Sequence, residues 1–340
     1  MKINSKLFVT TFLGLISCSV REITVKTFPR SVYAAQKVII DTDAGSDDAV
    51  AILLTLKSEF KGFEVIAITC TYGNVYLRNV VENVLKILTV ANRSDIPVYE
   101  GVDEPLIQKY IFSDGYFGSD GFGDFNFTEK ITAKVDKRKH AAVALVDLVK
   151  KYPGEITLLS LGPLTNAAVA ASLYPLFLKR LKNHIILGSS VAGVGNSAPN
   201  VEFNFYQDPE SNYIVLNRTK LSVLYPWETV LSSHIPVDWR LNVLGKVNST
   251  IVRFLNEAER KSISQSTSWL SSDTMAAAVM IWPEFITRSI KTNVEAVYTG
   301  MARGSVLVDY TNVTGRPVNT EIVQAFNVTA FKDVLLELFS

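Results

Sequence analysis

Short hydrophobic runs alternate with longer amphipathic segments along most of this chain. Five runs have the length and the β-branched content of buried strands: 37–41, 64–70, 156–160, 183–188 and 221–225. Five intervening segments have the hydrophobic spacing of helices: 47–59, 76–92, 140–151, 164–172 and 208–217. This alternation predicts a mainly parallel sheet with helices on both faces. No Pro/Ser-rich linker or internal repeat interrupts it, so we expect a single α/β domain with an open sheet.

The N-terminal segment has the layout of a secretory signal. Lys2 and Lys6 precede an apolar stretch at 7–16, and the small residues 17–19 follow it. We therefore expect a signal peptide at 1–19, an extension at 20–36 and a folded domain at 37–340. A bacterial lipoprotein signal with an acylated Cys18 is the alternative. Six N-x-[ST] sequons favour a secreted, extracellular glycoprotein; they begin at Asn92, Asn126, Asn217, Asn248, Asn312 and Asn327.

Composition and charge narrow the possible partners. The chain is 48% hydrophobic and carries a net charge of +1, with acidic and basic residues mixed along it. The basic cluster at 134–139 is short and includes Asp136, which is typical of a solvated loop. We therefore expect neither a nucleic acid nor a membrane as partner. If Cys18 leaves with the signal, Cys70 has no disulfide partner, and its apolar strand predicts a buried, inert thiol.

The first predicted strand runs directly into an acidic segment. Asp41, Asp43, Asp47 and Asp48 lie within eight positions, between the apolar run 38–40 and the apolar helix that follows. In an open α/β sheet the carboxyl ends of strands are where ligands bind. This density of negative charge at such an edge predicts a bound cation.

Three simpler interpretations explain the acidic segment less well. A solvated loop would have polar flanks, whereas both flanks here are apolar. A helix N-cap accounts for a single carboxylate. An EF-hand needs an acid, a glycine and a glutamate at its positions five, six and twelve, where this chain has Gly45, Ser46 and Ile52.

Further polar residues follow other predicted strands. Gly162 to Asn166 follow the strand at 156–160, and Asn196, Glu202 and Asn204 lie in a polar loop whose amides and carboxylate suit sugar hydroxyls. Asp273 begins a helix of small residues, where an acid is commonly a cap. The segment 111–127 mixes glycines, acids and aromatic residues, and is typical either of a functional loop or of a surface loop pinned by its aromatics.

These blocks together resemble the nucleoside hydrolase family, the calcium-dependent nucleoside N-ribohydrolases of the inosine-uridine preferring type. The acidic run 41–48 is similar to the family's signature, with alanine where proline is common, and four further blocks and Asp273 follow in the family's order: 71–74, 162–166, 195–196 and 202–204. The resemblance covers about residues 37 to 338. It implies a Rossmann-like open sheet and hydrolysis of ribonucleosides to free base and ribose.

The resemblance also implies roles for individual residues. Ca²⁺ would be bound by Asp43, Asp48 and Asp273 and by the backbone carbonyl of Leu161, and Asp43 would be the general base. A second set would bind the ribonucleoside: Asp47, Asn74, Asn196, Glu202, Asn204 and Asp273. The chemistry agrees with this assignment, because calcium prefers hard oxygen ligands and the chain has no His or Cys cluster. A homodimer or homotetramer is implied as well.

The chain departs from the family at the residue before the last predicted calcium ligand. Some members have a histidine there that protonates the leaving base, and others a tryptophan that stacks on it; this chain has Ser272. Tyr116, Phe117 and Asp120 in the aromatic loop are possible substitutes, and Trp269 is equally suited to the core and to a base platform. The aromatic loop favours purine nucleosides. His140 and His184 are expected to be structural, and His234 is unassigned.

Two other functions remain to be compared. Asp41 and Asp43 after a strand, with Ser160 as a second motif, resemble a haloacid-dehalogenase-type phosphatase, but the extra carboxylates would repel a phosphate. The second alternative is a secreted, catalytically silent protein of the same fold that binds calcium or nucleosides. The presence of all six polar side chains at 43, 47, 48, 202, 204 and 273 favours an enzyme.

Overall fold

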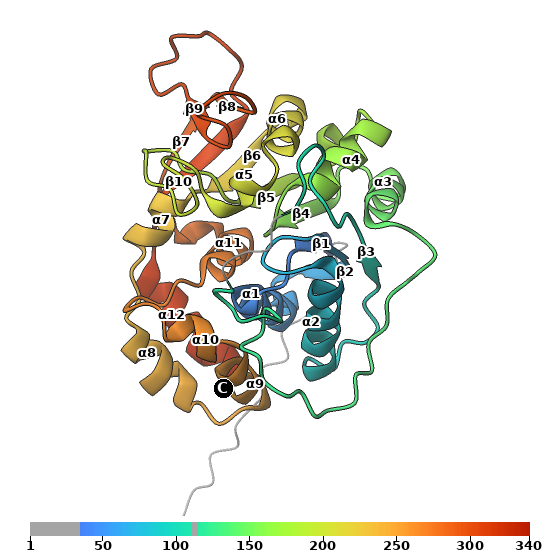
Figure 1. Ribbon diagram of the computed structural model, residues 1–340, viewed down its shortest axis with the longest axis vertical. Coiled ribbons are helices and arrows are strands. Elements are labelled where there is room, and N and C mark those ends of the chain that lie inside the picture. Colours follow the sequence, from blue (N-terminus) through green and yellow to red (C-terminus); the bar gives the residue numbers. More distant parts are fainter. Residues whose placement is uncertain (1–34, 111–114) are drawn as a thin grey trace, which may run out of the picture.

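The computed structural model describes residues 35–110 and 115–340, and in this part of the chain an eight-stranded sheet forms the centre of the molecule (Figure 1). Its strand order is β3-β2-β1-β4-β5-β6-β10-β7. The strands are β1 (Gln36–Thr42), β2 (Phe63–Cys70), β3 (Val98–Glu100), β4 (Ile156–Ser160), β5 (Asn183–Leu187), β6 (Ser222–Tyr225), β7 (Ile286–Thr292) and β10 (Thr320–Phe326). Neighbouring strands are parallel except that β7 is antiparallel to β10.

Helices cover both faces of the sheet and form two hydrophobic cores. One core includes α1 (Ser46–Lys57), α2 (Leu77–Val90), α7 (Trp227–Ser232), α9 (Thr250–Ala258), α11 (Ser272–Ile281) and α12 (Val328–Phe339). The other includes α3 (Ala141–Lys151), α4 (Thr165–Leu173) and α6 (Pro209–Arg218). Successive strand residues alternate between the faces, so that Ile39 packs in the second core and Ile40 in the first.

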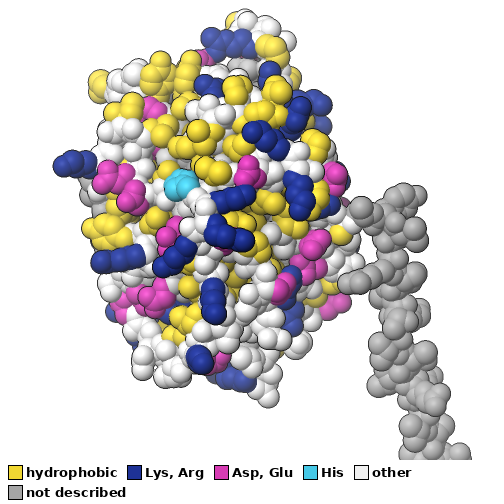
Figure 2. All heavy atoms as spheres, turned by 90° about the vertical axis from the view of Figure 1, so that its right-hand side faces the viewer, with side chains coloured by type: hydrophobic (Ala, Val, Ile, Leu, Met, Phe, Trp, Pro, Cys, Tyr) yellow, Lys and Arg dark blue, Asp and Glu magenta, His cyan; other side chains and the backbone are white. Residues whose placement is uncertain are grey.

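Shorter elements complete the described fold. These are the helices α5 (Phe203–Gln207), α8 (Val237–Asn242) and α10 (Arg260–Ile263), the antiparallel pair β8 (Val294–Ala296) and β9 (Val306–Val308), and 3-10 turns at Glu59–Lys61, Leu178–Arg180, Leu244–Lys246 and Pro283–Phe285. No helix among the described residues is long and apolar enough to cross a membrane. On the face shown in Figure 2, basic side chains are interspersed with acidic and hydrophobic ones.

The predicted fold class is confirmed. The five expected strands and five expected helices are present, with ends displaced by at most two residues. Cys70 is a buried free thiol, as expected from its strand. The elements from β7 to α12 were not predicted individually. The predicted signal peptide at 1–19 lies outside the described residues, as does most of the extension at 20–36, so both stay predictions.

The order of the strands brings remote loops together at one edge. β1 lies between β2 and β4, with Asp41 opposite Thr69 on one side and Ser160 on the other. Because these strands are parallel, the segments that follow β1, β2, β4 and β5 all emerge at the same edge of the sheet. This is the edge at which the sequence predicted the site.

Candidate active site

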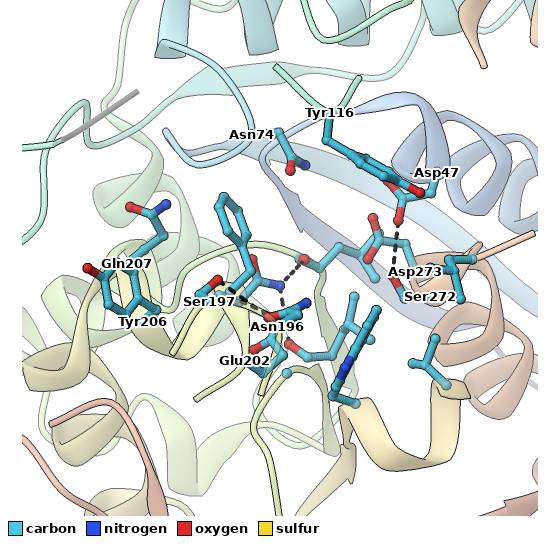
Figure 3. Close-up of a pocket in the computed structure, with 18 of the residues that line it drawn as sticks. Asp47, Asn74, Tyr116, Asn196, Ser197, Glu202, Tyr206, Gln207, Ser272 and Asp273 are labelled. Atoms are coloured by element: carbon cyan, nitrogen blue, oxygen red, sulfur yellow. Dashed lines mark hydrogen bonds between the residues drawn. The ribbon is translucent and has the colours of Figure 1, made fainter. Parts of the chain in front are cut away.

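A cavity of about 580 Å³ opens at this edge (Figure 3). Nine of the eleven predicted site residues line it: Asp47, Asn74, Tyr116, Phe117, Leu161, Asn196, Glu202, Asn204 and Asp273. The other two, Asp43 and Asp48, are buried. Segments separated by more than two hundred residues therefore contribute to one site, with the size expected for a small-molecule pocket.

Three carboxylates converge at the end of the cavity where α1 and α11 begin. Oxygen atoms of Asp47, Asp48 and Asp273 all lie within 4.8 Å of one another. The first two belong to the first turn of α1 and the third to the first turn of α11, and these helices pack against each other. Helix N-termini favour negative charge, which offsets part of the repulsion among the three groups.

Asp43 is held beside this cluster by the loop after β2. Its Oδ2 accepts a hydrogen bond of 2.8 Å from the backbone N–H of Asn74, whereas its buried Oδ1 has no partner. Two glycines enclose the side chain: a Cβ on Gly73 would lie 2.0 Å from Asp43 Oδ2, and a Cβ on Gly162 would lie 2.9 Å from Asp43 Oδ1. The close approach of both backbones is possible only because these residues are glycines.

Burial makes this group of carboxylates electrostatically costly. Burial, with repulsion from neighbouring carboxylates, raises the pKa of Asp43, Asp47 and Asp273 well above the usual range, and burial also raises that of Asp48. None of the four forms an ion pair among the described residues, and the buried Asp47 Oδ1, like Asp43 Oδ1, has no hydrogen-bond partner. Unpaired buried carboxylates and an all-oxygen donor set fit a divalent cation.

The remaining carboxylate oxygens are oriented by hydrogen bonds. Asp48 accepts from the hydroxyl of Thr42, from the N–H of Gly45 at 2.8 Å and from the side-chain amide of Asn74 at 3.4 Å. Asp47 Oδ2 accepts from the hydroxyl of Ser272 at 3.0 Å. Both oxygens of Asp48 therefore accept hydrogen bonds, whereas Asp47 keeps Oδ1 without a partner.

Asp41 has a structural position below the site. It is buried within β1 and accepts hydrogen bonds from Thr69 at 2.6 Å and from Asn166 at 2.9 Å. Burial raises the pKa of Asp41 to about 6. Asn166 also donates to the carbonyl of Cys70 at 2.9 Å, so the pair joins β1, β2 and the start of α4. Asp41 does not line the cavity, which gives no support to its use as a phosphatase nucleophile.

Glu202 and Asn204 form the opposite wall. Glu202 caps α5: Oε1 accepts from the N–H of Asn204 at 2.9 Å, and Oε2 from those of Ser189 at 2.9 Å and Phe205 at 3.2 Å. Burial raises the pKa of Glu202 to about 7. The amide of Asn204 donates to the carbonyl of Leu161 at 2.7 Å, which leaves that carbonyl one lone pair for a further donor or a metal.

The cavity has residues that sequence reasoning missed. Trp227, Val230 and Leu270 form an apolar part of the wall, and Gln108, Lys109, Ser197, Tyr206 and Gln207 add polar groups. Figure 3 shows Tyr206 and Gln207 at the opposite end from Ser272 and Asp273. Trp227 follows Pro226 at the end of a predicted parallel strand, and that position could have identified it.

Two proposed substitutes for the leaving-group residue lie elsewhere. Trp269 does not line the cavity; it is 4% exposed, and its indole N–H donates to Glu259 at 2.5 Å. The structure therefore supports Trp269 as a core residue and not as a platform for the base. The carboxylate of Asp120 accepts from the N–H groups of Phe122 and Asp124 and does not reach the cavity either. Its role is to stabilise the aromatic loop.

The described part of the aromatic loop, residues 115–127, is hydrogen-bonded to the rest of the fold, and 111–114 lie outside the described residues. Arg260 donates to the carbonyls of Gly123 at 2.5 Å and Asp124 at 2.6 Å, and Gln265 donates to that of Tyr116 at 2.9 Å. The rings of Tyr116 and Phe117 pack edge to face, with centroids 4.8 Å apart. Both rings therefore reach the cavity from a fixed backbone, which favours the functional interpretation of this segment.

No histidine lines the cavity among the described residues. His184 is buried in β5 and bonds to Ser160 at 3.0 Å, and burial lowers its pKa to about 3. His140 caps α3, accepting from the N–H of Ala142 at 3.2 Å. The ring of His234 forms a hydrogen bond of 2.9 Å with Ser268, and His234 does not line the cavity. The first two are structural, as expected.

Fold and cavity together define an α/β enzyme whose acidic centre could hold a metal ion beside a polar, sugar-sized site. The family model described as inosine-uridine preferring nucleoside hydrolase matches residues 38–333. The chain belongs to the nucleoside hydrolase family, whose members are metal-dependent N-ribohydrolases.

Individual relatives agree with this assignment. The inosine-uridine preferring nucleoside hydrolase of Crithidia fasciculata is 30% identical over 310 residues, covering 89% of this chain and 96% of that protein. A probable uridine nucleosidase 2 of Arabidopsis thaliana is 41% identical over 182 residues, so that this chain spans only 55% of its length. A solved inosine-guanosine nucleoside hydrolase superposes with a TM-score of 0.82 at 29% identity, covering 89% of this chain and 98% of that one.

Proposed function

We propose that this protein hydrolyses the N-glycosidic bond of ribonucleosides, releasing free base and ribose. The observation that carries the proposal is the cavity itself, in which an acidic centre and a polar wall from Asn196 to Asn204 surround one space. Asp43, buried beside the acidic centre, keeps an Oδ1 without a hydrogen-bond partner. A buried carboxylate oxygen without a hydrogen-bond partner is uncommon in a folded protein and fits a role as metal ligand or general base.

We propose Ca²⁺ as the resident metal. Asp48, Asp273, Asp43 and the free lone pair of the Leu161 carbonyl supply only hard oxygen atoms, which suit calcium better than a transition metal. The position of Asp47 in the same cluster makes it a further candidate ligand, in addition to its predicted contact with ribose. When bound, the ion would lower the pKa of a water molecule and orient it.

The side chains of the chain would carry out the remaining steps. Asn74 holds Asp43 through Oδ2, so Oδ1 is the oxygen able to take a proton from the attacking water. Positive charge that develops at the anomeric carbon would be stabilised by the surrounding carboxylates, as in glycoside hydrolysis. Asn196 and Asn204 would bind ribose hydroxyls and hold the sugar in place for attack.

The base would lie against the apolar wall near Ser272. The hydroxyl of Ser272 already donates to Asp47, and a serine is too weak an acid to protonate a leaving base. We propose instead that Tyr116, Phe117 and Trp227 bind the base through its faces, with a preference for purines because stacking on each ring is worth about 1–3 kcal/mol. Uridine is the second candidate, favoured by the plant relatives named uridine nucleosidases.

Release of base and reducing sugar from inosine and from uridine tests the proposal. The purified protein is assayed with and without a calcium chelator, beside Asp43→Ala and the control Asp136→Ala, a half-buried carboxylate that does not line the cavity and pairs with Arg138 at 2.6 Å. We expect release that the chelator and Asp43→Ala both abolish and the control retains. No release from either nucleoside by protein that still binds calcium would favour the silent binding protein.

We also propose that the protein is secreted and glycosylated. Five sequon asparagines are exposed: Asn92, Asn126, Asn217, Asn248 and Asn312. Asn327 is half-buried and caps α12, accepting from the N–H of Ala330 at 3.1 Å, so we expect no glycan there. Expression in a eukaryotic secretory host, with a glycosidase mobility shift, tests this; retention in the cell without glycans would contradict it.

Light scattering tests the proposed homodimer or homotetramer.

A further inference from the structure

The loop that follows β5 wraps around a single carboxylate from α7. Glu228 Oε1 accepts hydrogen bonds from the hydroxyl of Ser190 at 2.6 Å and from the N–H groups of Val191, Ala192 and Val194 at 3.1, 2.8 and 3.2 Å. Oε2 accepts only from Val191, at 3.0 Å. Successive backbone N–H groups that converge on one anion form a nest, and here the anion is a side chain of the protein itself.

The nest is selective for a charged carboxylate. Although burial works to raise the pKa of Glu228, the hydrogen bonds from Ser190, Val191 and Ala192 outweigh it and lower the pKa below its usual value. Hydrogen bonds to an ionised acceptor are about twice as strong as neutral ones. The hydrogen bonds that attach this loop to α7 are therefore stronger than the bonds between neutral groups that hold an ordinary turn.

The clamped loop leads directly into the cavity wall. Asn196 and Ser197 line the cavity two and three residues after Val194, and the tight turn at Gly195 leaves no room for a Cβ, which would lie 1.8 Å from the carbonyl of Ala198. On the other side of the clamp, Trp227 precedes Glu228 and lines the cavity too. One turn of α7 thus connects the apolar wall to the polar wall.

We infer that Glu228 is a positioning residue that sets Asn196 relative to Trp227 and thereby fixes the sugar relative to the base. Glu228 does not line the cavity and touches no predicted metal ligand, so it acts on Asn196 through the loop. Its charge also adds to the burial that raises the pKa of Glu202. The inference rests on the proposed function, because it takes Asn196 to bind the ribose. Tyr310, which donates to the carbonyl of Val191 at 2.7 Å, supports the loop from the outside.

A double-mutant cycle tests the inference. We expect Glu228→Ala and Asn196→Ala each to lower kcat/KM by about 10- to 100-fold, since a misplacement of about 1 Å has effects of this size. The kcat/KM of the double variant should be at most about threefold lower than that of the less active single variant, because both changes remove the same contact. Independent effects that multiply would overturn the inference, as would wild-type activity in Glu228→Ala.

A conservative variant separates positioning from general destabilisation. Glu228→Gln keeps an acceptor where four of the five bonds converge, although a neutral one, and should recover part of the activity lost in Glu228→Ala. Asp238→Ala, an exposed acid on the next helix that accepts only from Asn242 at 2.7 Å, is the matched control and should retain full activity. Equal loss of activity in the Gln and Ala variants would contradict a role based on hydrogen-bond geometry.

Hydrogen exchange distinguishes failure of the inference from failure of the proposed function. The N–H groups of Val191, Ala192 and Val194 should be protected in the wild type and in Glu228→Gln, and should exchange rapidly in Glu228→Ala while the strands stay protected. This readout needs no substrate. If these N–H groups stay protected in Glu228→Ala, Glu228 does not hold the loop and the inference is overturned. If they lose protection but the wild-type protein cleaves no nucleoside, only the proposed function is overturned.

Discussion

Gly73→Ala should disable the site without changing any residue that contacts the substrate. A Cβ at position 73 would lie 2.0 Å from Asp43 Oδ2 and 2.7 Å from Asp43 Cβ and Cγ. Ordinary contact between such atoms is about 3.5–4.0 Å, so the carboxylate or the loop must move by at least about 1 Å. The same movement breaks the hydrogen bond from Asn74 that leaves Oδ1 free.

The structure sets the size of the expected effect. A displacement of about 1 Å at a reacting group lowers the rate about 100-fold, and overpacking of a well-packed site lowers the free energy of unfolding by about 1–3 kcal/mol. We therefore expect kcat/KM for inosine or uridine to fall by about two orders of magnitude. Gly162→Ala approaches the same side chain at 2.9 Å and should have a smaller effect.

The assay needs a control that loses stability alone. Gly154 has a φ of +77°, and a Cβ at this position would meet no atom within 4 Å, so Gly154→Ala strains the backbone in an open turn far from the cavity. We expect it to lower the free energy of unfolding by about 1–2 kcal/mol and to keep full activity. If Gly73→Ala retains activity within about threefold of the wild type, Asp43 is not confined as the structure indicates, and the reasoning is refuted.

Three further predictions concern stability, measured by chemical denaturation. Saturation of the aspartate cluster with Ca²⁺ should raise the unfolding free energy, by about 2.7 kcal/mol at a hundredfold excess over Kd, and Asp48→Asn should abolish the gain. Burial lowers the pKa of His184 from 6.5 to about 3, so the free energy of unfolding should fall as the pH drops from about 6.5 toward 3. His184→Gln should reduce this loss. Arg240→Ala should cost about 3–5 kcal/mol, because it leaves the buried Glu259 unpaired, and a cost below about 1 kcal/mol would contradict this account.

The central sheet could be predicted because the signal of each of its strands is local in the sequence. The runs at 37–41 and 156–160 are largely apolar, as strands buried on both faces are, and the helices between them carry regular hydrophobic spacing. β7 escaped prediction because it lies at the edge of the sheet, where most of its residues are exposed or half-buried and the hydrophobic pattern is weak.

The position of the acidic run at the ligand-binding edge could also be predicted, because the carboxyl ends of strands in an open parallel sheet lie at the edge where ligands bind. What surrounds it depends on the tertiary structure. Asp273 joins Asp47 and Asp48 only because α11 packs against α1, more than two hundred residues away in sequence. Trp269 was equally suited to the core and to a base platform by its sequence, yet it donates to Glu259 in the core, whereas Trp227 lines the cavity.

The sequence by itself therefore determined the class of fold, the edge of the sheet that carries the cavity and the acidic and amide side chains that line it, since hydrophobic period and side-chain type are local properties. Tertiary structure alone decided which aromatic rings face the cavity, that Gly73 and Gly162 enclose Asp43, and that Glu228 clamps the loop before Asn196. Contacts of this kind depend on the order of the strands and the packing of the helices, and no periodicity along the chain encodes the distance between two segments that meet only in the fold.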